Sequence, residues 1–260
     1  MKDRKYKILV LSDLKESTQV TLKNTIGLAK MINGSIEFFH VTKPTDIVNS
    51  DSQLSAKRNI NRQFIATDKK IKQLLDPVLL DYDINIKHKY AIGNVKSEIE
   101  KRINALKPDI VVLGKRKPKV LNFIGDNVTD YILKHYKGAV MIASKDNIID
   151  FDSQLSIGAL NDFEEAFNKD LTKSLIDSTE VPLKAFKIGN SNTNKIKTTD
   201  NEKNIIEYVF KDSPGVVGTL SGYISKNNIN LLYLDRQTKH TKEAYTKDLI
   251  DKVEVSLLVT

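Results

Sequence analysis

The chain has 260 residues, of which 40% are hydrophobic and 28% are charged, and it contains no cysteine. This composition is typical of a globular protein with one large core or two cores of ordinary domain size. The lack of cysteine excludes disulfides, thiol catalysis and cysteine-ligated zinc, and no apolar run approaches the roughly 18 residues that a membrane-spanning helix needs. Since no signal-peptide pattern follows Met1, we expect cytoplasmic residence and no membrane partner.

The positive charge is concentrated in the first part of the chain. Residues 1–150 contain 27 Lys and Arg against 17 Asp and Glu, whereas residues 151–260 contain 14 against 16. This asymmetry fits either a surface for anionic partners or lysines that solvate helices. No aromatic residue lies within the basic loop Lys115–Lys119 to stack on bases, which argues against nucleic acid as a partner.

Strand and helix patterns alternate through residues 1–148. Apolar runs too short for helices predict parallel strands, and the amphipathic stretches between them predict covering helices. The predicted strands are residues 7–11, 35–41, 84–92, 110–113 and 139–143, and the predicted helices are residues 18–32, 55–80, 94–106 and one entered near 125–129. We therefore expect a doubly wound α/β domain whose ligand site lies beyond the carboxyl ends of the strands.

The remaining residues repeat this order with parts missing. Leu155–Leu160 and the following Asn161-Asp162 mirror residues 7–13 at a spacing near 149 residues, which indicates a tandem domain. The predicted strands are residues 155–160, 182–188, 205–210, 230–234 and 254–260, with helices ending near 178, spanning 216–224 and preceding 254. A polar stretch, residues 189–201, replaces the long second helix. We therefore expect two domains, residues 1–148 and a reduced second domain, residues 151–260.

The stretch from residue 109 to residue 144 reads as strand, glycine, basic loop, helix and strand, and here the chain resembles the universal stress protein family. The nucleotide-binding branch of that family has a G-x2-G-x9-G loop followed by Ser or Thr. Gly114 matches the first glycine, Lys117 replaces the second, and Gly125 to Thr129 stand at the last glycine, the hydroxyl and the helix start. The resemblance implies two tandem, mostly parallel five-stranded sheets with adenine nucleotide alpha hydrolase-like, flavodoxin-like layering.

The resemblance also implies a nucleotide site in the first domain, with ATP as its ligand; the residues by themselves require no cofactor. The residues it assigns to this site are Asp13, Val41, Gly114, Arg116, Gly125, Asn127, Val128 and Thr129. Asp13 fits a turn or helix cap equally well. The basic loop either supplies side-chain charge for phosphates or marks a site that has lost its nucleotide. No glycine lies between Leu234 and the last predicted helix, so we expect at most one nucleotide per chain.

Nothing in the sequence indicates turnover chemistry. The four histidines lie in different predicted elements without metal-ligand spacing, and no Gly-x-Ser-x-Gly motif occurs. We expect a stress-associated binding or regulatory protein that senses an adenine nucleotide. The alternatives are an interaction scaffold for an unknown protein partner, without nucleotide, and a C-terminal ACT-like ligand-sensing domain, indicated by the Asp212-Ser213-Pro214-Gly215-Val216 pattern.

The last strands of the two domains, residues 139–143 and 255–259, are apolar edges that would associate if left open. In the resembled family, single-domain members pair through this strand about a two-fold axis. We therefore predict that the two domains pair through these strands as a pseudo-dimer, and further homo-oligomers remain open.

Overall fold

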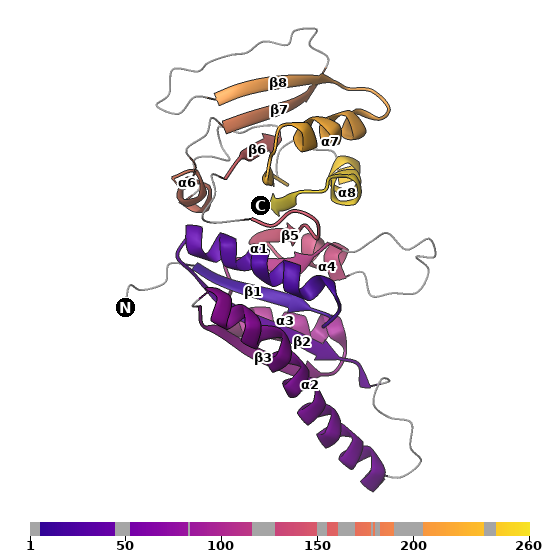
Figure 1. Cartoon of the computed structure of the whole chain (residues 1–260). Helices are drawn as coiled ribbons and strands as arrows, with labels where there is room; N and C mark the ends of the chain where they lie inside the picture. The colour runs from indigo at the N-terminus through magenta and orange to yellow at the C-terminus, as the bar shows by residue number, and fades with distance from the viewer. Residues whose placement is uncertain are drawn as a thin grey trace.

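The computed structural model describes residues 6–44, 53–82, 84–115, 128–149, 155–160, 170–177, 179, 183–189, 205–236 and 243–260. Its ten strands form one sheet in the order β3-β2-β1-β4-β5-β10-β9-β6-β7-β8 (Figure 1). Neighbouring strands are parallel everywhere except between β5 and β10. We call β1–β5 with their helices the first half of the molecule, and β6–β10 with theirs the second half.

The first half contains β1 (Tyr6–Ser12), α1 (Ser17–Met31), β2 (Gly34–Thr42), α2 (Gln53–Tyr82), β3 (Ile86–Ile92), α3 (Val95–Leu106), β4 (Ile110–Gly114), α4 (Val128–His135) and β5 (Ala139–Ala143). The second half contains β6 (Ile157–Leu160), α6 (Asp170–Ile176), β7 (Leu183–Gly189), β8 (Ile205–Lys211), α7 (Val216–Lys226), β9 (Leu231–Leu234), α8 (Glu243–Lys252) and β10 (Ser256–Val259). Within the described ranges, no helix is long and apolar enough to cross a membrane.

Helices cover both faces of the sheet, which confirms the predicted doubly wound α/β fold. One core cluster joins α1, α2 and α6 to the sheet through residues such as Leu28, Ile71 and Leu175. The other joins α3, α4, α7 and α8 to the opposite face. The central strands are buried on both faces, which explains their uninterrupted apolar runs. β3 lies at one end of the sheet, and exposed residues alternate with less exposed ones over its first part.

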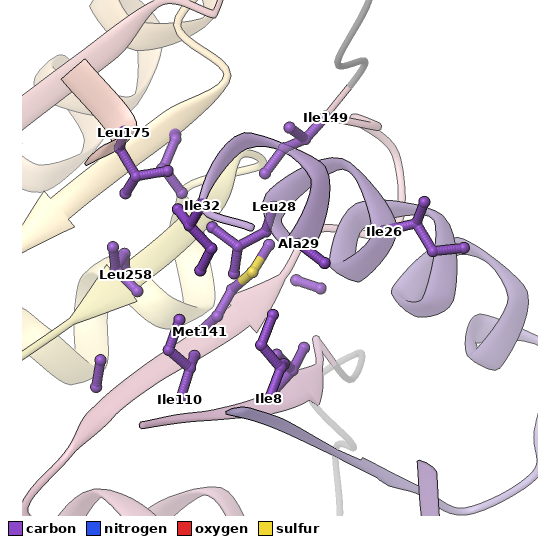
Figure 2. Packing of buried hydrophobic residues seen from close by; sticks show 14 of the residues in the cluster. Ile8, Ile26, Leu28, Ala29, Ile32, Ile110, Met141, Ile149, Leu175 and Leu258 are labelled. Carbon is purple, nitrogen blue, oxygen red and sulfur yellow. The ribbon is translucent and has the colours of Figure 1, made fainter. Parts of the chain in front are cut away.

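The two halves meet at β5 and β10, which confirms the predicted contact between the last strands. In this antiparallel pair Met141 lies opposite Leu258, and both side chains are fully buried. Figure 2 shows Leu175 and Leu258 of the second half near Ile32, the residue that follows α1, in the same core cluster as Met141. The two predicted sheets therefore form one continuous sheet, since each half closes the open edge of the other.

The segment after β5 lies against α1. The backbone N–H of Ile149 donates to Asn24 Oδ1 at 2.8 Å, and Asn24 also donates from Nδ2 to the Ser144 carbonyl at 3.0 Å. A Cβ on Gly27 would lie 2.3 Å from the Ile149 carbonyl oxygen, so α1 can approach this segment only because residue 27 is glycine. The domain boundaries at residues 148 and 151 remain a prediction.

The ACT-like alternative for the second half is wrong. β8 is followed by α7 and β9, and the described residues between β9 and β10 contain α8 but no strand. All strand pairs within the second half are parallel, as in the first half. The Asp212 to Val216 pattern instead marks the turn into α7, where Gly215 adopts a positive φ of 91°.

Candidate functional site

A cavity of about 410 Å³ lies at the carboxyl ends of β1, β2 and β4 in the first half. β1 pairs with β2 on one side and with β4 on the other, so the chain reverses its direction across the sheet at β1. The helices on either side of such a reversal diverge and leave a crevice, which is the usual ligand site of an open α/β sheet. The cavity lies where the sequence predicted a site.

The turn between β1 and α1 forms one wall of the cavity. Asp13 lines the cavity and accepts a hydrogen bond on Oδ1 from the Lys15 N–H at 3.2 Å, while Ser12 Oγ accepts from the Leu14 N–H at 3.0 Å. Leu14 has a positive φ of 56°, which is costly for a side chain that carries a Cβ. The turn role of Asp13 is therefore visible, and its contact with a ligand remains a prediction.

Hydroxyl groups gather where α1 begins. Ser17, Thr18 and Thr21 line the cavity, and Thr129 faces it from the first turn of α4. The hydroxyls of Thr18 and Ser12 lie 2.9 Å apart, and Thr21 donates its hydroxyl proton to the Ser17 carbonyl at 2.9 Å. The starts of α1 and α4 carry backbone N–H groups without helical partners, so the cavity edge at these two helix starts is suited to negative charge.

Gly114 ends β4 at the edge of the cavity, and its place in the sequence has a packing reason. A Cβ added there would lie 2.5 Å from Thr21 Oγ1, a distance that real Cβ atoms do not adopt. α1 can therefore rest against β4 only because residue 114 is glycine. This requirement holds with or without a phosphate in the cavity.

Apolar side chains also line the cavity. They come from β2, α3, β4 and the start of α4. They are Phe39, Val41, Val95, Ile99, Leu113 and Val128. A cavity that combines apolar side chains with hydroxyl groups at two helix starts suits a ligand with one flat, weakly polar end and one anionic end.

His40 lines the cavity and is held by two hydrogen bonds. Nδ1 is 2.8 Å from the Ser12 carbonyl oxygen, and Nε2 is 3.1 Å from Thr42 Oγ1. Burial lowers the pKa of His40 below its usual value, although the hydrogen bond to Ser12 and the charge of Asp13 oppose this. A neutral ring that donates from Nδ1 and accepts on Nε2 satisfies both contacts. These contacts give His40 a structural role at the rim of the core.

Lys115, the first residue of the basic loop, points to the second half. Its Nζ donates to the Val253 carbonyl just beyond α8, and burial lowers its pKa. Its backbone N–H donates to the Ala143 carbonyl at 2.9 Å. The hypothesis that the basic side chains of this loop all serve a phosphate is therefore wrong for Lys115. Residues 116–120 lie outside the described residues.

Five of the eight residues assigned to the site from the sequence line this one cavity: Asp13, Val41, Gly114, Val128 and Thr129. Arg116, Gly125 and Asn127 lie outside the described residues. Whether any of the eight binds a nucleotide remains a prediction. Sequence reasoning missed Thr21 as a cavity residue, although its spacing of three or four residues from Ser17 and Thr18 places all three on one face of α1.

Comparisons with known proteins agree with this architecture. The model of the Universal stress protein family matches residues 6–144. A universal stress protein from Archaeoglobus fulgidus superposes with a TM-score of 0.70 at 14% identity, over 98% of this chain and 95% of that one. No curated protein gave a sequence match.

Two further solved structures cover 98% of this chain and 92% of their own. One is a functionally unknown protein from Pseudomonas aeruginosa PAO1, with a TM-score of 0.57 at 10% identity. The other is a putative universal stress protein from Pseudomonas aeruginosa UCBPP-PA14, with a TM-score of 0.55 at 12% identity. At these identities the superpositions support the fold, while the family model covers more than half of the sequence. The chain belongs to the universal stress protein family.

Proposed function

We propose that the first half binds an adenine nucleotide in the cavity and that the protein acts as a nucleotide-dependent binding or regulatory protein. The observation that carries this proposal is one cavity of about 410 Å³ that combines apolar side chains with hydroxyl groups at two helix starts. That volume lies within the range of roughly 300–1,000 Å³ that is usual for small-molecule sites. The base would lie against Phe39 and Val95, and the phosphates would lie near Ser17 and Thr129.

Among its described residues, the second half offers no equivalent phosphate position. Ile110 of β4 and Leu231 of β9 pair with equivalent positions of β1 and β6, the first strands of the two halves. Counting four residues onward from each, Asp235 lies where the first half has Gly114. Asp235 is buried at 3% exposure. A carboxylate there repels phosphate, because like charges held close together cannot both remain ionised without cost. This supports a stoichiometry of one nucleotide per chain.

We infer that the cavity binds a ligand rather than catalyses a reaction, and the hydrogen bonds of His40 support this. Its two ring nitrogens are already occupied by Ser12 and Thr42, so the ring is held as a structural element and not presented as a base. Asp13 is likewise engaged by the Lys15 N–H.

The test is titration calorimetry with ATP, ADP and adenosine on the natural protein and on Thr129→Asp. An acid in the first turn of a helix favours the helix, so Thr129→Asp should fold normally while repelling phosphate. We expect about tenfold or greater loss of ATP affinity, since 1.4 kcal/mol of repulsion suffices, with adenosine binding unchanged. Thr219→Asp, at an exposed position in the first turns of α7, is the matched control and should bind ATP like the natural protein. Two equivalent ATP sites, or equal ATP affinity in both variants, would refute the proposed site.

An interaction scaffold without nucleotide is the second candidate. It is favoured by the contacts that give Gly114 and Lys115 structural roles independent of any ligand. If the scaffold is correct, ATP, ADP and adenosine will all give no heat of binding and no rise in melting temperature at millimolar concentration.

A further inference from the structure

Two cations cross the junction between the halves in opposite directions. Lys115 directly follows β4 and donates to the Val253 carbonyl, which lies just after α8. Arg236 follows β9 by two residues and donates from Nη1 to the carbonyls of Leu133 and Tyr136, at 2.8 Å each, and from Nη2 to the Gly138 carbonyl. These three carbonyls belong to the last turn of α4 and the residues just after it.

The two contacts are equivalent by strand register. Ile110 pairs with Ala139 in the first half as Leu231 pairs with Ser256 in the second. This aligns residue 110 with 231 and residue 139 with 256. Counting five residues onward from the first pair and three residues back from the second, residue 115 corresponds to 236 and residue 136 corresponds to 253. The backbones agree with this: Lys115 N–H donates to the Ala143 carbonyl, and Arg236 N–H donates to the Thr260 carbonyl at the corresponding position. Each half thus supplies one cation to the carbonyl end of the last helix of the other half.

Both contacts act on parts of the first half that form the cavity. Lys115 is bonded to Gly114, which lines the cavity. Arg236 holds the carbonyl end of α4, and the first residues of that helix, Val128 and Thr129, also line the cavity. α4 has only eight residues, so it is about 12 Å long and moves as one rigid body. Fixing its last turn therefore fixes its first turn.

We propose that Lys115 and Arg236 are positioning residues, through which the second half sets the geometry of the ligand cavity in the first half. This inference rests on the proposed function, and it gives the second half a role although it offers no phosphate position of its own. Neither side chain needs to touch the ligand. Both act because a cation near the last carbonyls of a helix is favoured by hydrogen bonding and by the helix dipole. The partial burial of both cations, which lowers their pKa values, keeps water from competing for these carbonyls.

The experiment compares Lys115→Met and Arg236→Met with a control that removes a cation of the same kind elsewhere. Lys184 donates from Nζ to the Asn227 carbonyl at 3.0 Å, wholly within the second half. Lys184→Met therefore removes a half-buried contact between a cation and a carbonyl without touching the junction. We expect Lys115→Met and Arg236→Met to weaken ATP binding by about fivefold or more, within the roughly two- to thirtyfold range of such coupling, and Lys184→Met to leave it unchanged. Lys115→Arg should bind ATP about as well as the natural protein, because arginine keeps a cationic donor for the Val253 carbonyl.

Hydrogen exchange measured by mass spectrometry makes the outcome independent of the ligand. Lys115→Met should raise exchange in the peptide covering residues 110–115, and Arg236→Met in the peptide covering 128–138, while Lys184→Met should change neither. If the natural protein binds ATP and both junction variants bind it equally well, the positioning role is overturned and the proposed function stands. If the natural protein binds no nucleotide, the proposed function fails, and the exchange pattern alone decides: unchanged exchange in both peptides overturns the positioning role, and the expected increases support it.

Discussion

The first and second halves use the same strand order but place different side chains at equivalent positions. In the first half Glu37 of β2 and Arg102 of α3 form a bidentate ion pair, with both side chains largely buried. The second half has Tyr223 at the position of Arg102, in an aromatic group with Phe186, Tyr208 and Phe210. The first half has Gly114 at the cavity, and the second half has Asp235.

The contacts near the junction are preserved even where the residue types change. The Lys7 N–H donates to Asp109 Oδ2 at 2.7 Å, and the Ser156 N–H donates to Asn230 Oδ1 at 3.0 Å. Lys115 and Arg236 repeat the same contact in opposite directions. Gly114, which directly precedes Lys115, is replaced by Asp235 in the second half, so a cavity residue differs even where the neighbouring junction contact is kept. The junction contacts are therefore common to both halves, and the glycine at the cavity belongs to the first half alone.

The largest expected effect is at the junction itself. Met141 and Leu258 are equivalent by register, lie opposite each other and are fully buried. Met141→Ala and Leu258→Ala should each lower the free energy of unfolding by about 2–5 kcal/mol, since each leaves a cavity in a shared core. Chemical denaturation monitored by circular dichroism measures this. Ile65→Ala, at 71% exposure, is the control and should change stability by no more than about 0.5 kcal/mol. If only one of the two substitutions lowers the free energy of unfolding, the two halves do not depend equally on the junction for their stability.

The ion pair between Glu37 and Arg102 distinguishes the two halves in their cores. Arg102→Met should cost about 3–5 kcal/mol of folding stability, because it leaves the Glu37 carboxylate buried without its partner. Replacing both residues by Met should recover most of this loss, since it removes the buried carboxylate together with its partner. Denaturation of the two single variants and the double variant measures the coupling. If the double variant is as unstable as Arg102→Met, the ion pair is itself a main source of stability.

Substitution of Gly114 should change folding stability by a smaller amount, and the structure predicts whether it rises or falls. Gly114→Ala should destabilise the protein by about 1–3 kcal/mol through overpacking against Thr21, and Thr21→Ala in the same chain should relieve most of it. Gly218, in the helix α7, has no heavy atom within 4 Å of an added Cβ. Gly218→Ala should therefore stabilise the protein by up to about 1 kcal/mol. Thermal melting of these variants checks both signs, and a neutral Gly114→Ala would remove the packing explanation.

The sequence predicted the local elements because their signals are local. Apolar runs located β4 and β5 correctly, and the spacing near 149 residues revealed the tandem arrangement. The pairing of the last strands was predicted from two open apolar edges together with the resemblance to a family whose single-domain members pair through this strand. The packing role of Gly114 and the destinations of Lys115 and Arg236 could not be predicted, because each depends on residues that are distant in the chain: Thr21, Val253 and Tyr136. The cavity was predicted in place, since the end of a parallel strand at a reversal is a topological feature, but its hydroxyl lining was only partly predicted.

The smallest expected effect is a pH dependence that belongs to the first half. Since burial lowers the pKa of His40, the unfolded chain binds a proton at a higher pH than the folded chain does. The contribution is fully present above the unfolded pKa of about 6.5 and is lost as pH falls toward the lowered folded value, with a slope of at most about 1.4 kcal/mol per pH unit. The charge of Asp13 raises the pKa of His40, and the charge of Lys70 lowers it. Protonation of the ring would also remove the nitrogen that accepts a hydrogen bond from Thr42.

His40→Gln should flatten the dependence of folding stability on pH between pH 7 and pH 5. His135→Gln, on the exposed surface of α4, is the matched control for the loss of an imidazole. Lys187 occupies the position of His40 in the second half, so the comparison concerns the first half alone. A pH profile that survives His40→Gln would place the pH dependence outside the cavity.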